Sequence, residues 1–132
     1  MSSIFTKIIQ GELPGHFVWQ DEHAVAILTI EPIQEGHLLL IPRKEVDHWD
    51  DLQPELAAHL MSVAQTLAKA LKKAYACQRV SMMIIGLEVP HTHIHLSPIN
   101  DMADANISNA KRADGDSLAA AAEKIRAALS TP

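Results

Sequence analysis

The pattern of hydrophobic and polar positions changes its period along the chain, and each period predicts a type of element. Apolar residues recur at three- and four-residue steps over 52–75 and 117–129, which predicts a long amphipathic helix and a C-terminal helix. The segment 4–10 has the same spacing and predicts a short helix that Gly11 would end. Runs of aliphatic and aromatic residues predict strands at 16–20, 24–30, 37–41, 79–85 and 93–99.

The order of these elements indicates the fold class. Strands, a long helix, further strands and a last helix are typical of an α+β domain with a mainly antiparallel sheet, here five-stranded, that helices cover on one face. Pro54 fits the start of the long helix because the first helical turn has no amide partner to lose. Asp116 or Ser117 is expected to cap the last helix. A chain of 132 residues can bury one core, so we expect residues 1–132 to form a single domain.

Composition narrows the classes of partner. The chain has 11 basic and 16 acidic residues spread along its length, and the net charge of −5 argues against sequence-independent binding of nucleic acid. There is no basic segment followed by an apolar stretch, and no apolar run near the roughly 20 residues that cross a bilayer. We therefore expect a cytoplasmic protein with no membrane partner. The single cysteine, Cys77, cannot form an intrachain disulfide and is expected to pack as a small apolar residue.

Three histidines at spacing two, His91, His93 and His95, are the strongest sign of chemistry. In a strand they would share one face, while Thr92, Ile94 and Leu96 would pack on the long helix from the other. Core filling does not explain such a cluster, because each buried imidazole would need a hydrogen-bond partner. The histidines expected to be solvated or singly hydrogen-bonded are His16, His23, His48 and His59.

Two chemistries fit this cluster. In one, His37, His91, His93 and His95 hold a zinc ion, since neutral imidazole is a common zinc ligand. In the other, one imidazole attacks phosphorus while its neighbours hold the phosphate oxygens. A catalytic zinc site usually has carboxylates or carbonyls behind its ligands, and Glu88 is the only acidic residue near the cluster in sequence. The residues alone leave both chemistries open.

Residues 91–97 resemble the signature of the histidine triad family, His-x-His-x-His followed by apolar residues. Residues 4–14 are similar to that family's opening segment, and 36–44 to its Gly-His-apolar-Pro-Lys strand. These blocks cover nearly the whole chain, and the resemblance is closest to the small dimeric branch that hydrolyses nucleoside phosphoramidates. It implies a HIT-like fold, a purine nucleotide or nucleotide conjugate as ligand, and a homodimer formed through the long helix and the strand at 79–85. It calls for no cofactor and no metal.

The resemblance also implies a role for each histidine. His93 would attack the α-phosphorus and become nucleotidylated before water releases the nucleoside monophosphate. His95 would contact the α-phosphate, His91 would orient the cluster, and His37 would lie beside them. This chemistry needs a neutral nucleophilic nitrogen on His93, with its other ring nitrogen held by an acceptor that fixes the tautomer. Two variants stay open: a dinucleoside polyphosphate hydrolase, and a nucleotide-binding regulatory protein with weak chemistry.

By the same resemblance, six apolar residues would line the site for the nucleobase and sugar. Core packing is an equally good interpretation for each of them. These residues are Ile4, Phe5, Ile8, Leu13, Leu28 and Ile30.

Several positions depart from the family pattern. Thr29 replaces an aspartate that faces the ribose, and Leu87 replaces a glutamine that contacts phosphate. Glu88 follows it and either faces solvent or selects a cationic leaving group. The glycine-rich loop before this segment is also short. A cysteine pair that holds structural zinc in some relatives is missing, with Thr6 and Gly15 at the expected places, so we expect no structural zinc.

Overall fold

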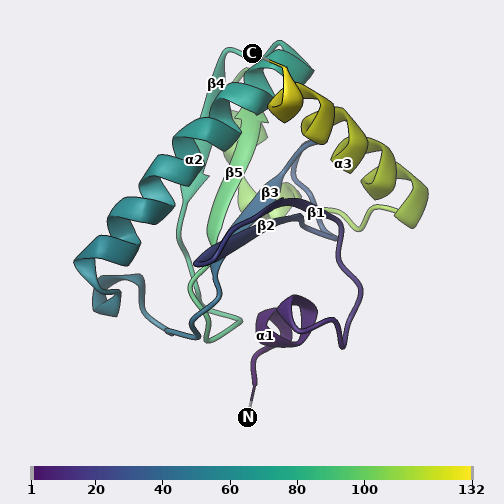
Figure 1. Cartoon of the computed structure of the whole chain (residues 1–132). Coiled ribbons are helices and arrows are strands. Elements are labelled where there is room, and N and C mark those ends of the chain that lie inside the picture. The colour runs from purple at the N-terminus through teal and green to yellow at the C-terminus, as the bar shows by residue number, and fades with distance from the viewer. Residues whose placement is uncertain (1, 132) are drawn as a thin grey trace.

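The centre of the protein is an antiparallel sheet whose five strands follow the order β1-β2-β3-β5-β4 (Figure 1). This computed structural model describes residues 2–131. Each neighbouring pair of strands is antiparallel, which confirms the predicted α+β class. The strands are β1 (Phe17–Gln20), β2 (Ala24–Leu28), β3 (Leu38–Pro42), β4 (Arg79–Met83) and β5 (Ile94–Ile99).

Helices cover both faces of the sheet, and unequally (Figure 1). The long α2 (Pro54–Tyr75) and α3 (Gly115–Ser130) pack on one face, and the short α1 (Ile4–Ile9) packs on the other. Side chains alternate between the faces along each strand, so β2 and β3 supply both cores and all their residues are buried. The α1 face contains Phe5, Val25, Ile27, Leu39 and Ile41.

One close packing contact lies just before the start of β3. Gly36 lies just before this strand with φ of +93°, a conformation that glycine adopts without a steric penalty. A Cβ at Gly36 would lie 2.5 Å from Cε2 of Tyr75, the last residue of α2. The end of α2 therefore packs directly on the turn that leads into His37, one of the candidate site residues.

Several element boundaries differ from the sequence prediction. β5 begins at Ile94 and not at residue 93, because the amide of Thr92 donates to the carbonyl of Val46 in the loop after β3. β2 and β4 stop two residues before the predicted ends, at Leu28 and Met83. The long helix begins at Pro54, two residues later than predicted, after a 3-10 turn at Trp49–Asp51.

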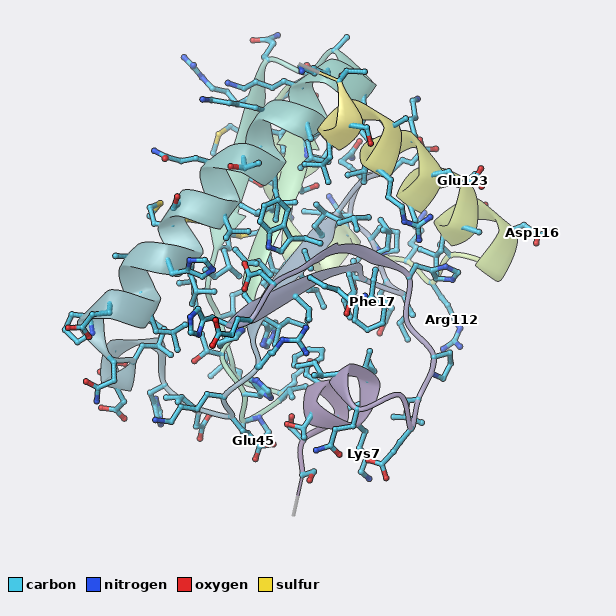
Figure 2. The ribbon with its side chains drawn as sticks, in the orientation of Figure 1. Lys7, Phe17, Glu45, Arg112, Asp116 and Glu123 are labelled. Atoms are coloured by element: carbon cyan, nitrogen blue, oxygen red, sulfur yellow. The ribbon has the colours of Figure 1, made fainter. Side chains whose placement is uncertain are left out.

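The cap of α3 also differs from the prediction. The Asp114 carboxylate accepts the backbone N–H of Ser117, so the helix begins before the predicted cap residues. Asp116 lies within the first turn, and its side chain points outward (Figure 2). Two 3-10 turns that the sequence did not reveal, Met102–Ala105 and Ile107–Asn109, connect β5 to α3. No helix within residues 2–131 combines the length and the apolar character that crossing a membrane requires.

Candidate active site

Four histidines gather on the face of the sheet that α1 covers. His95 lies in β5 opposite Leu39, and His37 immediately precedes β3. The ring centres of His93 and His95 are 5.1 Å apart, and those of His37 and His95 are 5.2 Å apart. The prediction placed all three triad residues on one face of a strand, whereas only His95 lies in β5, and His91 and His93 lie in the segment before it. The cluster forms nevertheless.

The opposite side of this segment faces the helices, as the alternation predicts. Ile94 and Leu96 pack in the core with Leu60 of α2. Thr92 departs from the prediction, because its hydroxyl donates to the carbonyl of Val46 at 2.7 Å. This side-chain hydrogen bond and the one from its own amide anchor the triad segment to the loop after β3.

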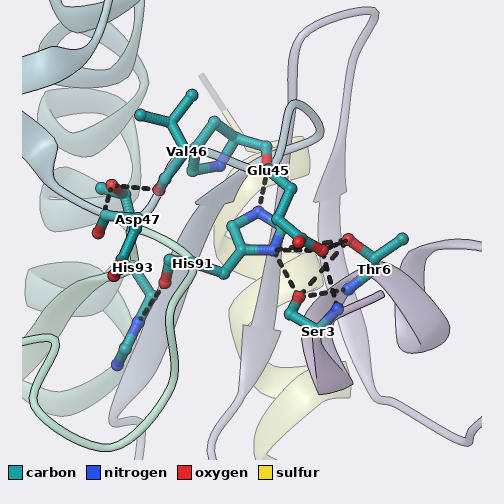
Figure 3. A network of polar contacts seen from close by, with 9 residues as sticks. Ser3, Thr6, Glu45, Val46, Asp47, His91 and His93 are labelled. Carbon is teal, nitrogen blue, oxygen red and sulfur yellow. Dashed lines mark hydrogen bonds and ion pairs between the residues drawn. The ribbon is translucent and has the colours of Figure 1, made fainter. Parts of the chain in front are cut away.

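His91 is fully buried, and both of its ring nitrogens are hydrogen-bonded (Figure 3). Nε2 lies 2.8 Å from the carbonyl oxygen of Pro42, and because a carbonyl can only accept, Nε2 carries the proton. Nδ1 lies 2.6 Å from Oγ of Ser3 and accepts its hydroxyl proton. Burial lowers the pKa of His91, which agrees with this uncharged form.

The backbone of His91 fixes the tautomer of His93. Nδ1 of His93 lies 2.8 Å from the carbonyl oxygen of His91 and must donate to it. The proton therefore stays on Nδ1, and Nε2 carries a lone pair. The structure thus supplies the acceptor that a nucleophilic His93 requires. The rings of Phe5 and His93 meet edge to face, with centroids 4.8 Å apart.

A second chain of hydrogen bonds fixes the protons of His37 and His95. The amide of Ile33 donates to Nδ1 of His37 at 3.1 Å, so the proton of His37 is on Nε2. That Nε2–H donates to Nδ1 of His95 at 3.0 Å. His95 in turn keeps its proton on Nε2. Two neighbouring rings therefore offer different groups: a lone pair on Nε2 of His93 and an N–H donor on Nε2 of His95.

Burial keeps this second pair uncharged near neutral pH. Burial, together with the neighbouring His95, lowers the pKa of His37 to about 3. Burial and the neighbouring His93 lower the pKa of His95 to about 4. In this uncharged form His37 donates to His95, and the N–H on Nε2 of His95 is left to donate a hydrogen bond to an anion.

The residues expected to wall a nucleotide fall into different environments. Phe5 is buried against the histidines, and Ile8 packs beside it in the same core. The prediction for Leu28 is wrong: its side chain points to the face that α2 and α3 cover and packs in the core there. Strand β2 is buried on both faces, so the sequence gives no sign of which side Leu28 takes.

The other expected contacts are accessible, and their role stays a prediction. Ile4, Leu13 and Ile30 are exposed, as is Glu88 in the loop before the triad. Thr29 is half-buried, and its amide donates to the carbonyl of His37 at 3.2 Å, next to the cluster.

The side chains are not arranged as the alternative hypothesis requires, in which four histidines of the cluster hold a zinc ion. Within residues 2–131, no group of three or more histidine, cysteine, aspartate or glutamate side chains is placed to hold a metal ion. Both nitrogens of His91 are hydrogen-bonded, and the facing nitrogens of His37 and His95 bond each other. Of the two positions where cysteines were expected, Thr6 lies beside His91, whereas Gly15 packs against Ile8.

Two further residues reach the site without a sequence signal. Ser3 and Glu45 lie 88 and 46 positions from His91 along the chain, yet both face its Nδ1. A serine before a short helix predicts an ordinary helix cap, and the Ser3 hydroxyl does accept the amide of Thr6. A glutamate in a polar loop is expected to face solvent. Only the packing of α1 against β3 brings them together.

The comparisons with known proteins agree with this arrangement. Residues 10–102 match the HIT domain, which is the family that residues 4–14, 36–44 and 91–97 resemble. The chain belongs to the HIT family. This HIT protein is 36% identical over 99 residues to the adenosine 5'-monophosphoramidase HNT1 of Saccharomyces cerevisiae, an alignment that covers 74% of this chain and 63% of the yeast protein.

Two further relatives support the family and the fold. An uncharacterized HIT-like protein of Methanocaldococcus jannaschii is 33% identical over 99 residues, which are 72% of this chain and 77% of that protein. The crystal structure of a Hit-like protein involved in cell-cycle regulation from Bartonella henselae matches with a TM-score of 0.86 and 30% identity, over 96% of both chains. The predicted HIT-like fold is confirmed.

Proposed function

We propose that this HIT protein hydrolyses nucleoside phosphoramidates or related nucleotide conjugates through a covalent nucleotidyl group on His93. The observation that carries the proposal is the hydrogen bond from Nδ1 of His93 to the carbonyl of His91, which leaves the Nε2 lone pair free to attack. The N–H of His95 beside it is a donor for a phosphate oxygen. The activity named for the yeast relative supports this substrate class.

The proposed reaction has two displacements at the α-phosphorus. Nε2 of His93 forms a bond to phosphorus as the phosphorus–nitrogen bond to the amine breaks, and the amine leaves with the electron pair and takes a proton from solvent. The nucleotidylated ring is then cationic, and the His91 carbonyl stabilises it through the Nδ1–H. Water attacks phosphorus in the second step, which releases the nucleoside monophosphate and restores His93. No cofactor takes part.

Substrate recognition in this proposal uses the exposed residues around the cluster. Ile4, Leu13 and Ile30 offer apolar contact to a purine base and sugar. Thr29 offers one hydroxyl to the ribose, and that oxygen already accepts the amide of Glu31 at 3.3 Å. Glu88 would favour an amine leaving group that carries a positive charge.

The proposal includes a homodimer through α2 and β4. Strand β4 is the last strand of the sheet and pairs only with β5 within residues 2–131, so its outer edge has backbone groups open to a second strand. Exposed apolar side chains lie on the same elements and the loop after them: Met61, Met82 and Ile85. Sizing chromatography with light scattering tests this part, and a monomer would contradict it.

The activity is tested with adenosine and guanosine phosphoramidates and dinucleoside polyphosphates, each incubated with the protein while released monophosphate is measured. The proposal predicts phosphoramidate turnover that persists in chelator and is lost in His93→Ala, with an unchanged circular dichroism spectrum. Turnover only of dinucleoside polyphosphates would identify the other activity within the family. Nucleotide-dependent thermal stabilisation without any turnover would indicate a regulatory binding protein and contradict the proposal.

A further inference from the structure

A polar network joins the N-terminal segment to the candidate active site (Figure 3). One carboxylate oxygen of Glu45 accepts the backbone N–H of Ser3 and the hydroxyl of Thr6, both at 2.7 Å. The hydroxyl oxygen of Ser3 accepts the amide of Thr6 at 3.1 Å. The Ser3 hydroxyl donates its own proton to Nδ1 of His91, because the oxygen lies 2.6 Å from this nitrogen and 3.4 Å from the Thr6 hydroxyl.

The direction of each hydrogen bond in this network is fixed. Thr6 gives its hydroxyl proton to the Glu45 carboxylate, which can only accept, and so has none left for His91. Ser3 is therefore the donor that satisfies Nδ1 of the buried His91 ring. The Glu45 carboxylate is 4.0 Å from the same nitrogen and acts on it through Ser3 rather than directly.

The network continues through His91 to the nucleophile. The Ser3 hydroxyl holds Nδ1 and the Pro42 carbonyl holds Nε2, so the ring has one orientation and one tautomer. Because both ring nitrogens are held, the backbone of His91 is also held in place. The His91 backbone carbonyl is the acceptor that keeps the proton of His93 on Nδ1. Two side chains outside the triad thus lie at the start of a chain of contacts that ends at the attacking atom.

We propose that Ser3 and Glu45 are positioning residues, which hold the His91 ring in one tautomer and so present the His93 lone pair to phosphorus. Glu45 places Ser3 by accepting its amide, and Ser3 places His91 by donating its hydroxyl proton. This inference rests on the proposed role of His93. It concerns the proton positions of the free protein, however, and these exist whether or not a substrate is turned over.

The histidine protons are measured directly by long-range proton–nitrogen correlation spectra of the ¹⁵N-labelled free protein, which identify the protonated nitrogen of each ring. The wild type is expected to show His91 protonated on Nε2 and His93 protonated on Nδ1. In Ser3→Ala and Glu45→Gln we expect His93 to give averaged signals from both tautomers. Ser3→Thr keeps the hydroxyl and should restore the wild-type pattern.

Matched variants separate this effect from a general loss of structure. Ser62→Ala and Glu123→Gln make the same chemical changes at exposed positions on α2 and α3, and both should keep the wild-type spectrum. Figure 2 shows Glu123 on α3. Ser3→Ala also removes the α1 cap, so it can lower stability for a separate reason. Glu45→Gln leaves the cap oxygen in place and is the second, independent variant.

Kinetics on an adenosine phosphoramidate supply the second measurement. Misplacing the nucleophile without touching the ligand should lower kcat about tenfold and leave KM within about twofold in both variants. Unchanged His91 and His93 tautomers in Ser3→Ala and Glu45→Gln would overturn the positioning role. The expected tautomers in a wild-type protein that turns over no substrate would instead sink the proposed function and leave the positioning inference standing.

Discussion

The stability of the protein should fall steeply as pH drops from 6 to 5, because His37 and His95 are held uncharged in the folded state. Burial lowers their pKa values from 6.5 to about 3 and about 4. In the unfolded chain both rings return to the ordinary value and bind protons that the folded protein cannot bind. The stabilisation is thus fully present above pH 6.5 and is lost as pH falls from there toward the folded pKa values.

The size of this loss follows from the two pKa values. A histidine that takes up a proton only on unfolding costs about 1.2 kcal/mol of stability between pH 6 and pH 5. His37 is 1% exposed and should contribute this full amount. His95 is partly exposed and contributes less, because solvent screens its charge. Together, His37 and His95 should lower the free energy of unfolding by about 2 kcal/mol between pH 6 and pH 5.

Urea unfolding followed by tryptophan fluorescence at several pH values between 7 and 5 measures this dependence. Carboxyl groups of the unfolded chain titrate near pH 4 and stay outside the window. In His37→Phe the free energy of unfolding is lower at every pH, and its slope against pH should decrease by about one proton. A free energy of unfolding that is flat or rises toward pH 5 would refute the hydrogen-bond chain of His37 and His95.

Three substitutions elsewhere test a packing contact and two sets of hydrogen bonds in the fold. Gly36→Ala should lower stability by about 2 kcal/mol in thermal unfolding, since its Cβ would meet Tyr75 at a positive φ, and an unchanged Tm would contradict this packing. Burial raises the pKa of Asp21, but four hydrogen bonds, one from His59, outweigh it and lower the pKa. Asp21→Asn should therefore cost about 2 kcal/mol above pH 5, and less as pH falls below 4. Thr92→Val keeps the volume but loses two carbonyl contacts, for about 1 kcal/mol in urea unfolding; no loss would mean that those carbonyls find other donors.

The fold was predictable where the chain repeats a period over many residues. Residues 54–75 keep a helical spacing for six turns, and the predicted helix there is wrong only at its first two residues. Boundaries that depend on distant partners were not predictable. The start of β5 is set by the hydrogen bond between Thr92 and Val46, which are 46 residues apart. The cap of α3 was misplaced for a simpler reason, because Asp114, Asp116 and Ser117 lie within four positions and each is a residue type that caps helices.

The candidate site also has a part that was predictable from the sequence and a part that was not. His91, His93 and His95 stand out because spacing two places side chains on one side of an extended chain. Their division of labour does not appear in the sequence, since it depends on which carbonyl or amide each nitrogen meets. Leu28 illustrates the converse error: in a strand buried on both faces, apolar character does not reveal which face a residue takes.

Trapping the covalent intermediate shows whether Nε2 of His93 attacks the α-phosphorus. The protein is mixed with an adenosine phosphoramidate, quenched in alkali within one turnover, digested and analysed by mass spectrometry. We expect one adenylyl group, bound to the ring of His93, on the peptide that carries this residue, and none in His93→Asn. Monophosphate release by His93→Asn at the wild-type rate, or an adduct on any other side chain, would contradict it.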